Sequence, residues 1–330
     1  MATYKGIKGV KVVTKATDPT ASEAEGTVWY NSTSPAALKY SIAGAGAWAS
    51  GGNILSARYY GAGAGLQTAA IYAGGDSPSG GPITVQCESY DGTSWTEVNN
   101  TTTTKIKRAS FGTSTSMVIA GGDPASSTLV ESWDGTSWTA APALNTGGRE
   151  RGGYGASNTA GGAVTGRGAP PSNPYMQVNE EFDGSAWAEA ADTNTGRSGA
   201  LTTGKSTSAA ICAGGFTPSL TTNSETWNGT SWAEGNNLNT ARATGGTAGP
   251  STAALTFGGE GPTALTESYD GTSWTEVAAL ATSRNLLGGA GLNNTSALAM
   301  AGSVPSPPVG STATEEWNDP SYTIKTVTVS

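Results

Sequence analysis

Apolar and polar residues alternate over short stretches of this chain, and glycine-rich segments separate those stretches. The stretches are rich in Thr, Val, Tyr and Trp, as in TVWY at 27–30 and TIKTVTV at 323–329. A period of two in β-branched and aromatic residues predicts half-buried β-strands. No helical period persists for three turns, so the pattern predicts an all-β protein.

One composite unit recurs along the sequence. It consists of an Arg, a glycine-rich stretch, an apolar run ending in Gly-Gly, a variable segment, Glu-x-aromatic and the turn Asp-Gly-Thr-Ser-Trp. The apolar runs occupy 69–75, 116–122, 158–162, 209–215, 253–259 and 297–302. The Trp residues that end the turns, with one further Trp upstream, stand at positions 48, 95, 138, 187, 232 and 274, which are 42–49 residues apart. A period in the mid-forties is typical of a four-stranded propeller blade.

The unit also has a physical logic. An Asp-Gly or Asn-Gly between two alternating stretches supplies the positive φ of a tight hairpin. Gly-Gly ends a strand where the backbone is crowded. The aromatic residues on both sides of the turn are expected to fill the wedge between neighbouring blades.

The order of Gly-Gly, aromatic and Trp resembles the kelch repeat over residues 46–320. Two units depart from that pattern: the run at 158–162 is short, and Ala301 stands where a glycine is usual. The resemblance implies an all-β, six-bladed kelch-like β-propeller. Seven blades, with a hairpin at 27–41 in the additional blade, is the alternative.

The ends of the repeat predict how the ring closes. The segment around Trp48, at 46–52, has no upstream partner, and the last unit has WNDPSY at 317–322 in place of a turn. A strand around Trp48 that completes the last blade would protect both open edges. We therefore expect an N-terminal arm with a hairpin at 1–45, a propeller at 46–320 and a C-terminal strand at 321–330 that packs near the arm.

Composition excludes several classes of function. The net charge of −8 argues against general nucleic-acid binding, and no apolar run approaches the length of a membrane span. The N-terminus lacks the apolar segment of a signal peptide, and the distant Cys87 and Cys212 are expected to be buried thiols. The chain has no histidine, so we expect no metal site, no cofactor and no catalytic residues.

Candidate binding residues come from two patterns. The repeats differ in length mainly between the Gly-Gly pair and the Glu, and the longest of these segments are 76–86, 163–178 and 303–313. Loops on a rigid scaffold commonly contain binding residues. From these loops we select Arg167, Tyr175 and Met176. The second pattern is one arginine per repeat, which bidentate contacts with an anion or an ion pair with the glutamate of the repeat would both explain. These residues are Arg58, Arg108, Arg151, Arg197, Arg242 and Arg284.

The sequence AEGTVWYNSTSPAALKY, followed by AWASGGN, resembles the N-terminal region of bacteriophage structural and tail-fibre proteins with Asp-Gly-Thr-Ser-Trp repeats, particularly from marine phages. The resemblance implies a virion protein, made in the host cytoplasm, that docks to other virion proteins through its arm. We expect the propeller loops to bind host surface polysaccharide, and a homo-oligomer is compatible with this role. The alternatives are a non-catalytic capsid decoration or spacer protein and a secreted or cell-surface adhesin.

Overall fold

The computed structural model describes residues 12–19, 27–33, 36–78, 81–124, 126–260, 263–305 and 308–327. The chain divides into two compact units. One, the propeller, spans Trp48–Trp317, and the other, the terminal unit, comprises Met1–Ala47 and Asn318–Ser330. Residues 1–11, 20–26 and 34–35 of the predicted arm lie outside the described residues.

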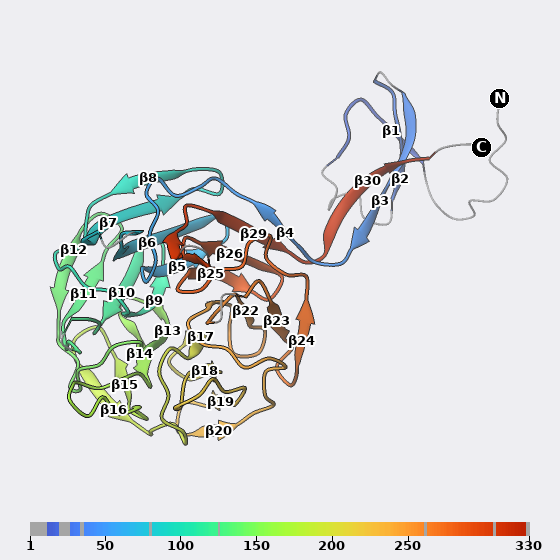
Figure 1. Ribbon diagram of the computed structural model, residues 1–330. Coiled ribbons are helices and arrows are strands. Elements are labelled where there is room, and N and C mark those ends of the chain that lie inside the picture. The colour runs from blue at the N-terminus through green and yellow to red at the C-terminus, as the bar shows by residue number, and fades with distance from the viewer. Residues whose placement is uncertain are drawn as a thin grey trace. The chain divides into compact units, whose positions relative to one another are not determined.

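The propeller contains six four-stranded sheets arranged as blades around a central axis (Figure 1). Blade one consists of β5 (Ala62–Leu66), β6 (Ala69–Asp76), β7 (Ile83–Tyr90) and β8 (Trp95–Val98). Blade two consists of β9 (Ala109–Thr113), β10 (Ser116–Ala120), β11 (Val130–Trp133) and β12 (Trp138–Ala141). Blade three consists of β13 (Gly152–Ser157), β14 (Ala160–Val164), β15 (Asn179–Phe182) and β16 (Trp187–Ala190).

The other three blades follow the same antiparallel order. Blade four consists of β17 (Leu201–Ser206), β18 (Ala209–Ala213), β19 (Ser224–Trp227) and β20 (Trp232–Glu234). Blade five consists of β21 (Gly246–Ala248), β22 (Leu255–Phe257), β23 (Thr266–Tyr269) and β24 (Trp274–Val277). Blade six consists of β25 (Gly288–Asn293), β26 (Ser296–Met300), β29 (Thr314–Asn318) and β4 (Ala47–Ser50).

Blade six confirms the predicted closure, because its outermost strand comes from the N-terminal side of the chain. The rings of Trp48 and Trp317 pack with centroids 5.5 Å apart. The indole N–H of Trp48 donates to Thr266 of blade five at 3.0 Å. On the blade-one side, Gly302 N donates to the Arg58 carbonyl at 2.9 Å. The ring therefore has six blades.

Packing between blades supplies the core. In each blade the aromatic at or next to the end of the third strand packs against the Trp at or next to the start of the fourth, with centroids 4.8–5.5 Å apart. Buried clusters then join one blade to the next: Ile71 and Cys87 of blade one pack with Met117 and Trp133 of blade two. Such aromatic pairs contribute about 0.5–1.5 kcal/mol each beyond their burial.

The turn between the third and fourth strands is built identically in five blades. In blade one, Asp91 Oδ1 accepts hydrogen bonds from the backbone N–H groups of Thr93 and Ser94, both at 2.8 Å. Gly92 has a φ of 92°, which a residue with a Cβ rarely adopts. Asp134, Asp183, Asn228 and Asp270 make the same two contacts in blades two to five.

The predicted register of blade three is wrong. The sequence pattern aligned Gly161-Gly162 with the Gly-Gly pairs of the other blades, but both residues lie inside β14. The structural equivalent is Thr165-Gly166, which has φ values of 55° and 113°. Gly161 and Gly162 instead leave room for the rings of Phe111 and Tyr154. The variable loop therefore begins at Arg167 and not at residue 163.

The terminal unit is a separate four-stranded sheet in the order β1 (Val13–Lys15), β2 (Val28–Asn31), β3 (Ala37–Gly44) and β30 (Ser321–Thr326). The hairpin predicted at 27–41 thus belongs to this sheet and not to a seventh blade. Trp29 is buried, and its indole N–H donates to Asp18 at 3.0 Å. The C-terminal strand β30 pairs antiparallel with β3.

Candidate functional site

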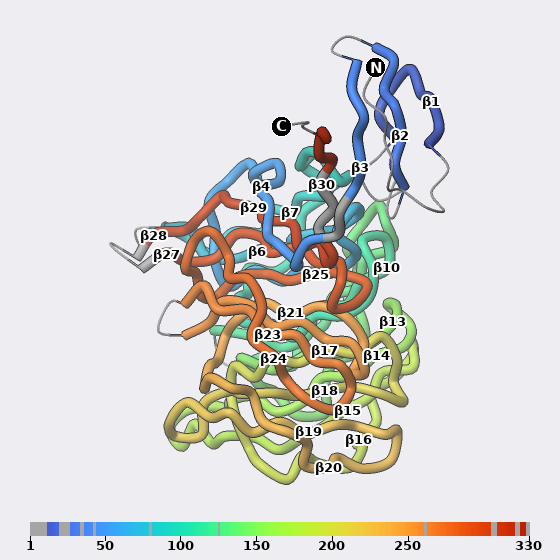
Figure 2. The backbone as a smooth tube through the Cα atoms, turned by 90° about the vertical axis from the view of Figure 1, so that its right-hand side faces the viewer, coloured from blue at the N-terminus to red at the C-terminus, as the bar shows by residue number. Residues whose placement is uncertain are grey.

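The antiparallel blades give the propeller two unlike faces. One, the turn face, carries the hairpins between first and second strands and the short aspartate turns. The other, the loop face, carries the variable loops and the connections between blades. Backbone bridges such as Arg149–Arg167 and Ser198–Phe216 tie these two kinds of segment together. A short hairpin of β27 (Ser303–Pro305) and β28 (Pro308–Gly310) stands out in the variable loop of blade six (Figure 2).

The arginine of every repeat forms a buried ion pair with the glutamate of its repeat. The pairs are Arg58–Glu88 (2.6 Å), Arg108–Glu131 (2.7 Å), Arg151–Glu180 (2.9 Å), Arg197–Glu225, Arg242–Glu267 (2.6 Å) and Arg284–Glu315 (2.7 Å). The sequence left two explanations for these arginines open, anion binding and ion pairing. In the structure all six form ion pairs.

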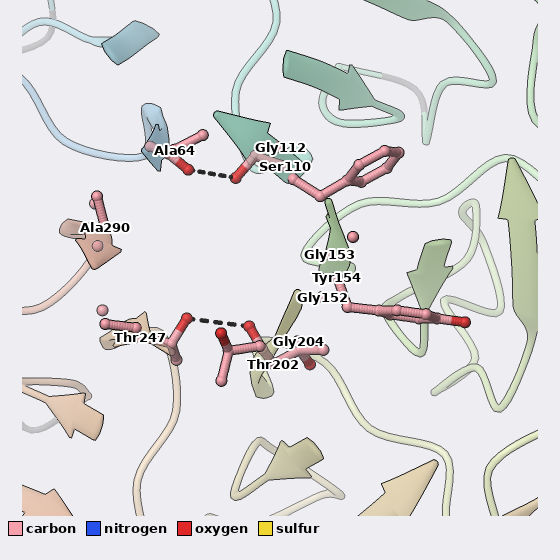
Figure 3. A pocket seen from close by; sticks show the side chains of 18 of the residues that line it. Ala64, Ser110, Gly112, Gly152, Gly153, Tyr154, Thr202, Gly204, Thr247 and Ala290 are labelled. Carbon is pink, nitrogen blue, oxygen red and sulfur yellow. Dashed lines mark hydrogen bonds between the residues drawn. The ribbon is translucent and has the colours of Figure 1, made fainter. Parts of the chain in front are cut away.

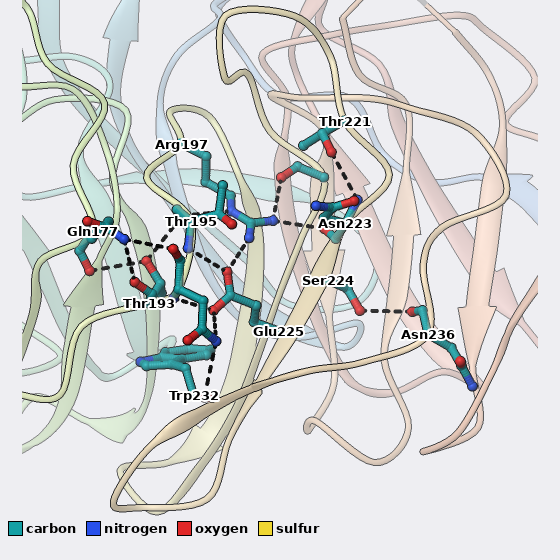
Figure 4. A network of polar contacts seen from close by, with 12 residues as sticks. Gln177, Thr193, Thr195, Arg197, Thr221, Asn223, Ser224, Glu225, Trp232 and Asn236 are labelled. Atoms are coloured by element: carbon teal, nitrogen blue, oxygen red, sulfur yellow. Dashed lines mark hydrogen bonds and ion pairs between the residues drawn. The ribbon is translucent and has the colours of Figure 1, made fainter.

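Blade four shows what each pair holds together (Figure 4). Arg197 also donates to the Asn223 carbonyl at 2.8 Å, and Glu225 accepts from the backbone N–H of Asn194 at 2.7 Å. The pair therefore joins the third strand of the blade to the segment that enters the blade. Arg108 differs: its Nε and Nη2 are buried without a hydrogen-bond partner within the described part of the chain.

The arginines reach equivalent glutamates from two backbone positions. In blades one, four, five and six the arginine lies four residues before the innermost strand, as Arg58 does before Ala62. In blades two and three it lies one residue before it, as Arg151 does before Gly152. In blade three, Gly148 lies four residues before the innermost strand, where blades one, four, five and six have their arginine. A Cβ on Gly148 would lie 3.1 Å from Cδ of Arg151.

Six residues surround the axis on the loop face, each two positions before an innermost strand. We call them the mouth ring: Tyr60, Lys107, Glu150, Gly199, Thr244 and Leu286. Every one has a positive φ, between 53° and 61°. Each backbone N–H donates to the carbonyl of the mouth-ring residue in a neighbouring blade, so the six bonds close a circle. They run Tyr60 to Leu286 (3.0 Å), Lys107 to Tyr60 (3.4 Å), Glu150 to Lys107 (2.9 Å), Gly199 to Glu150 (3.0 Å), Thr244 to Gly199 (2.7 Å) and Leu286 to Thr244 (2.8 Å).

A pocket of about 220 Å³ opens beside the mouth ring. Its lining residues are Tyr60, Glu150, Arg167, Ser198, Gly199, Phe216, Ala243, Thr244 and Glu260. Arg167 and Glu260 form no ion pair within the described residues, in contrast to the repeat arginines and glutamates. The guanidinium of Arg167 lies over the Tyr175 ring at 5.1 Å, and that ring packs against Phe216 at 6.0 Å.

Charged side chains form ion pairs at the edge of this pocket. The ammonium of Lys107 lies 3.2 Å from Glu150 and 3.4 Å from Asp123, and 4.8 Å from the centroid of the Tyr60 ring. Burial alone would lower the pKa of Lys107, but Tyr60, Glu150 and Asp123 outweigh it and raise that pKa. Burial also raises the pKa of Tyr60. Lys107 is therefore charged and Tyr60 is neutral at physiological pH.

The mouth ring leads into a narrow channel along the axis, with a cavity of about 170 Å³ (Figure 3). Hydroxyl groups link the innermost strands: Ser110 Oγ donates to Gly63 O at 3.1 Å, and Thr247 Oγ1 donates to Thr202 O at 3.0 Å. A Cβ on Gly153 would lie 2.2 Å from the Ser110 carbonyl oxygen. Close approach of the strands therefore keeps the channel narrow and polar.

The structure separates the three loop residues selected from the sequence. Arg167 lines the pocket, and its guanidinium stacks over the ring of Tyr175. Met176 is buried, and its sulfur lies close to Gly148, so its role is packing. Sequence analysis missed the mouth ring as well as Phe216 and Glu260. Only the constant distance to the innermost strand would have identified the mouth ring, because its six residues share a backbone conformation and no side-chain chemistry.

The described ranges contain neither a cluster of metal-binding side chains nor a membrane-spanning helix. Among these residues, no three His, Cys, Asp or Glu side chains gather closely enough to hold a metal ion. The described part of the chain also contains no helix with the length and apolar character needed to cross a membrane.

Comparison with known proteins supports the fold alone. No protein-family model matches the sequence, and no curated protein matches it either. Among solved structures, the chain is similar to the one titled "Structure of YjhT", a kelch-repeat β-propeller, with a TM-score of 0.65 and 14% identity. The match covers 83% of this chain and 99% of that one. The fold is therefore that of a kelch propeller.

Proposed function

We propose that this chain is a non-catalytic virion protein of a phage tail or fibre, and that its loop face binds glycans of the host surface. The observation that carries the binding proposal is the pocket beside the mouth ring. It combines aromatic side chains with an arginine and a carboxylate that lack ion-pair partners among the described residues. Ligand sites typically have this composition, in which a few polar groups are placed within an apolar surround.

Sugars match this lining chemically. The faces of Tyr60 and Phe216 offer flat apolar surface for the C–H side of a pyranose ring. Arg167 can donate to ring hydroxyls, and Glu260 can accept from them, with the added strength of charge-assisted hydrogen bonds. Sugar hydroxyls would satisfy both charged groups without a second protein chain.

The chain topology supports an anchoring role for the terminal unit. In blade six the chain enters the propeller at Trp48 and leaves it after Trp317, at the position where the other blades have their aspartate turn. Both connections therefore leave from the turn face. The variable loops and the pocket are not part of these connections, which suits presentation of the loop face to a ligand and attachment of the residues at 1–45 to other virion proteins.

A glycan array with the full-length protein tests the binding proposal. We expect Arg167→Ala and Phe216→Ala each to weaken binding to the recognised glycans at least tenfold, which corresponds to about 1.4 kcal/mol. Asp91→Asn, on the turn face, is the control and should bind like the wild type. Absence of binding by the wild type would instead favour a capsid decoration or spacer protein with no host ligand.

The virion proposal has its own test, because it rests on the sequence resemblance of the N-terminal region. Mass spectrometry of purified phage particles whose genome encodes the chain should detect it in a fixed number of copies. Antibodies against the propeller should label the tail or fibre in electron micrographs. Absence of the chain from intact particles would contradict the assignment.

A further inference from the structure

The mouth ring presents six unlike side chains at one repeated backbone position. Tyr, Lys, Glu, Gly, Thr and Leu each occupy it once, and all six are half-buried. The ion-paired Arg and Glu, by contrast, recur in all six repeats. The fold therefore requires no particular side chain at the mouth position.

The backbone conformation makes this diversity costly. A φ near 55° is the left-handed region, where a Cβ approaches the following carbonyl and glycine is favoured. Thr244, at 56°, is β-branched and is therefore the least suited of the six. Gly199 occupies the same position in blade four and makes the same two ring hydrogen bonds, so glycine satisfies the fold. The five other residues retain side chains that the ring itself does not need.

Strained residues of this kind persist where the surrounding structure holds them and function uses them. We propose that the mouth ring contains the specificity-determining positions of the glycan site, and that it contacts an uncharged terminal sugar of the glycan. This inference rests on the proposed function. It adds which side chains select the ligand and which class of sugar they accept.

The charge balance indicates an uncharged sugar. The mouth ring contributes one cation, Lys107, and one anion, Glu150, and these two pair at 3.2 Å. Asp123, which also lies beside Lys107, is paired in turn with Arg149 at 3.5 Å. In the adjacent pocket, Arg167 and Glu260 also have opposite signs. A neutral hexose can accept from each cation and donate to each carboxylate, whereas a charged sugar would leave one sign of charge uncompensated.

Glycine substitutions at the mouth test this inference, because strain and binding predict opposite effects. Thr244→Gly and Leu286→Gly should each raise Tm by about 1–3 °C, since they relieve the left-handed strain. The double variant should bind methyl glycosides of glucose, galactose or mannose at least tenfold more weakly by calorimetry. Stability and binding would then change in opposite directions.

Ala301→Gly provides the matched control. Ala301 has a φ of 58° but is fully buried and does not line the pocket. Its structural equivalents in blades one, two, four and five are glycines. This variant should gain stability to a similar extent and bind hexosides like the wild type.

Each other result contradicts a specific part of the inference. Unchanged hexoside binding by the double variant would overturn the role of the mouth ring and leave the proposed function intact. A fall in Tm for both Thr244→Gly and Leu286→Gly would overturn the strain argument. Wild-type binding of glucuronic acid or glucosamine, but not of neutral hexosides, would overturn the sugar class. Absence of any sugar binding by the wild type would overturn both proposals.

Discussion

At the scale of single residues, the arginine–glutamate pairs are the most demanding feature of the repeat. Both partners of Arg197–Glu225 have fully buried side chains. Burial of two charges carries a large desolvation cost, which the ion pair and its additional hydrogen bonds must offset. The pair is therefore more sensitive to loss of one partner than an exposed pair would be.

Glu225→Gln removes one charge from this pair. We expect a loss of about 3–5 kcal/mol in the free energy of unfolding, because Arg197 keeps its charge in a buried site. Urea denaturation of the full-length protein measures the change. Glu234→Gln, an exposed position on the neighbouring strand, should change stability by less than about 0.5 kcal/mol. Equal effects of the two variants would contradict the assigned role of the pair.

The aspartate turns make stability depend on pH. Hydrogen bonds to the carboxylate, first from the Ser94 N–H in the case of Asp91, lower the pKa of Asp91 below its usual 3.8. Asp134, Asp183 and Asp270 are shifted in the same direction. A carboxyl group with a lowered pKa in the folded state stabilises the fold above its unfolded pKa, and this contribution is lost as pH falls through the folded pKa.

Replacement of these four aspartates by asparagine should therefore flatten the dependence of Tm on pH between about pH 4 and pH 2. Asn228 shows that asparagine makes the same turn, with both N–H contacts at 2.9 Å. Thermal unfolding across this pH range is the measurement. An unchanged slope in the quadruple variant would assign the acid sensitivity to other groups.

Residue identity marked the arginines, the glutamates and the turns, because each needs a particular functional group at a fixed spacing, although it left ion pairing and anion binding as alternatives for the arginines. Residue identity did not predict the mouth ring. Its members share a position two residues before the innermost strand, and the boundary of a glycine-rich strand is poorly marked in sequence. The pocket residues Phe216 and Glu260 come from loops that differ in every blade, so no repeat pattern pointed to them.

At the scale of the strand, the innermost strands must approach one another closely around the axis. Glycines there are required by neighbouring backbone and not by turn geometry. Gly153, in β13, faces the backbone of β9 across the blade interface, where a Cβ would lie 2.2 Å from Ser110 O. The requirement does not extend to every blade, because Ser110, Thr202 and Thr247 hold the same strand position in blades two, four and five.

Gly153→Ala should destabilise the propeller by about 1–3 kcal/mol through overpacking, because the obstructing atom belongs to a backbone that cannot move alone. Guanidinium denaturation measures this loss. Ala156→Gly, at an exposed position later in the same strand, should cost no more than about 1 kcal/mol. A Gly153→Ala variant as stable as the wild type would contradict the close packing around the axis.

The alternation of apolar and polar residues predicted which segments form strands, but it did not always predict where a strand ends. In blade three the sequence offers Gly161-Gly162 and Thr165-Gly166 as possible strand ends. The sequence favours Gly161-Gly162 because glycine tolerates positive φ. In the structure, however, the strand ends at Thr165-Gly166, and Thr165 adopts the positive φ. The two glycines instead leave room for aromatic rings. Packing across the blade interface decided the register.

At the scale of the whole molecule, closure of the ring places the variable loops of all six blades on one shared loop face. The six repeated apolar runs predicted the blade number, and the unpartnered segment around Trp48 predicted the strand that closes the ring. The Trp48–Trp317 contact lies within blade six, whereas the Trp48–Thr266 and Gly302–Arg58 hydrogen bonds join that blade to its two neighbours. Closure is what brings mouth-ring residues from 60 to 286 into a single circle beside one pocket.

Hydrogen exchange of β4 tests this closure most directly. In a closed ring, the amides of Ala47–Ser50 pair with β29 and should exchange as slowly as those of β8 (Trp95–Val98), which holds the same outer position in blade one. Mass spectrometry of the full-length protein at neutral pH resolves the two segments. Exchange of β4 at the rate of an unpaired segment, with β8 protected, would show an open ring and would remove the shared loop face on which the proposed site depends.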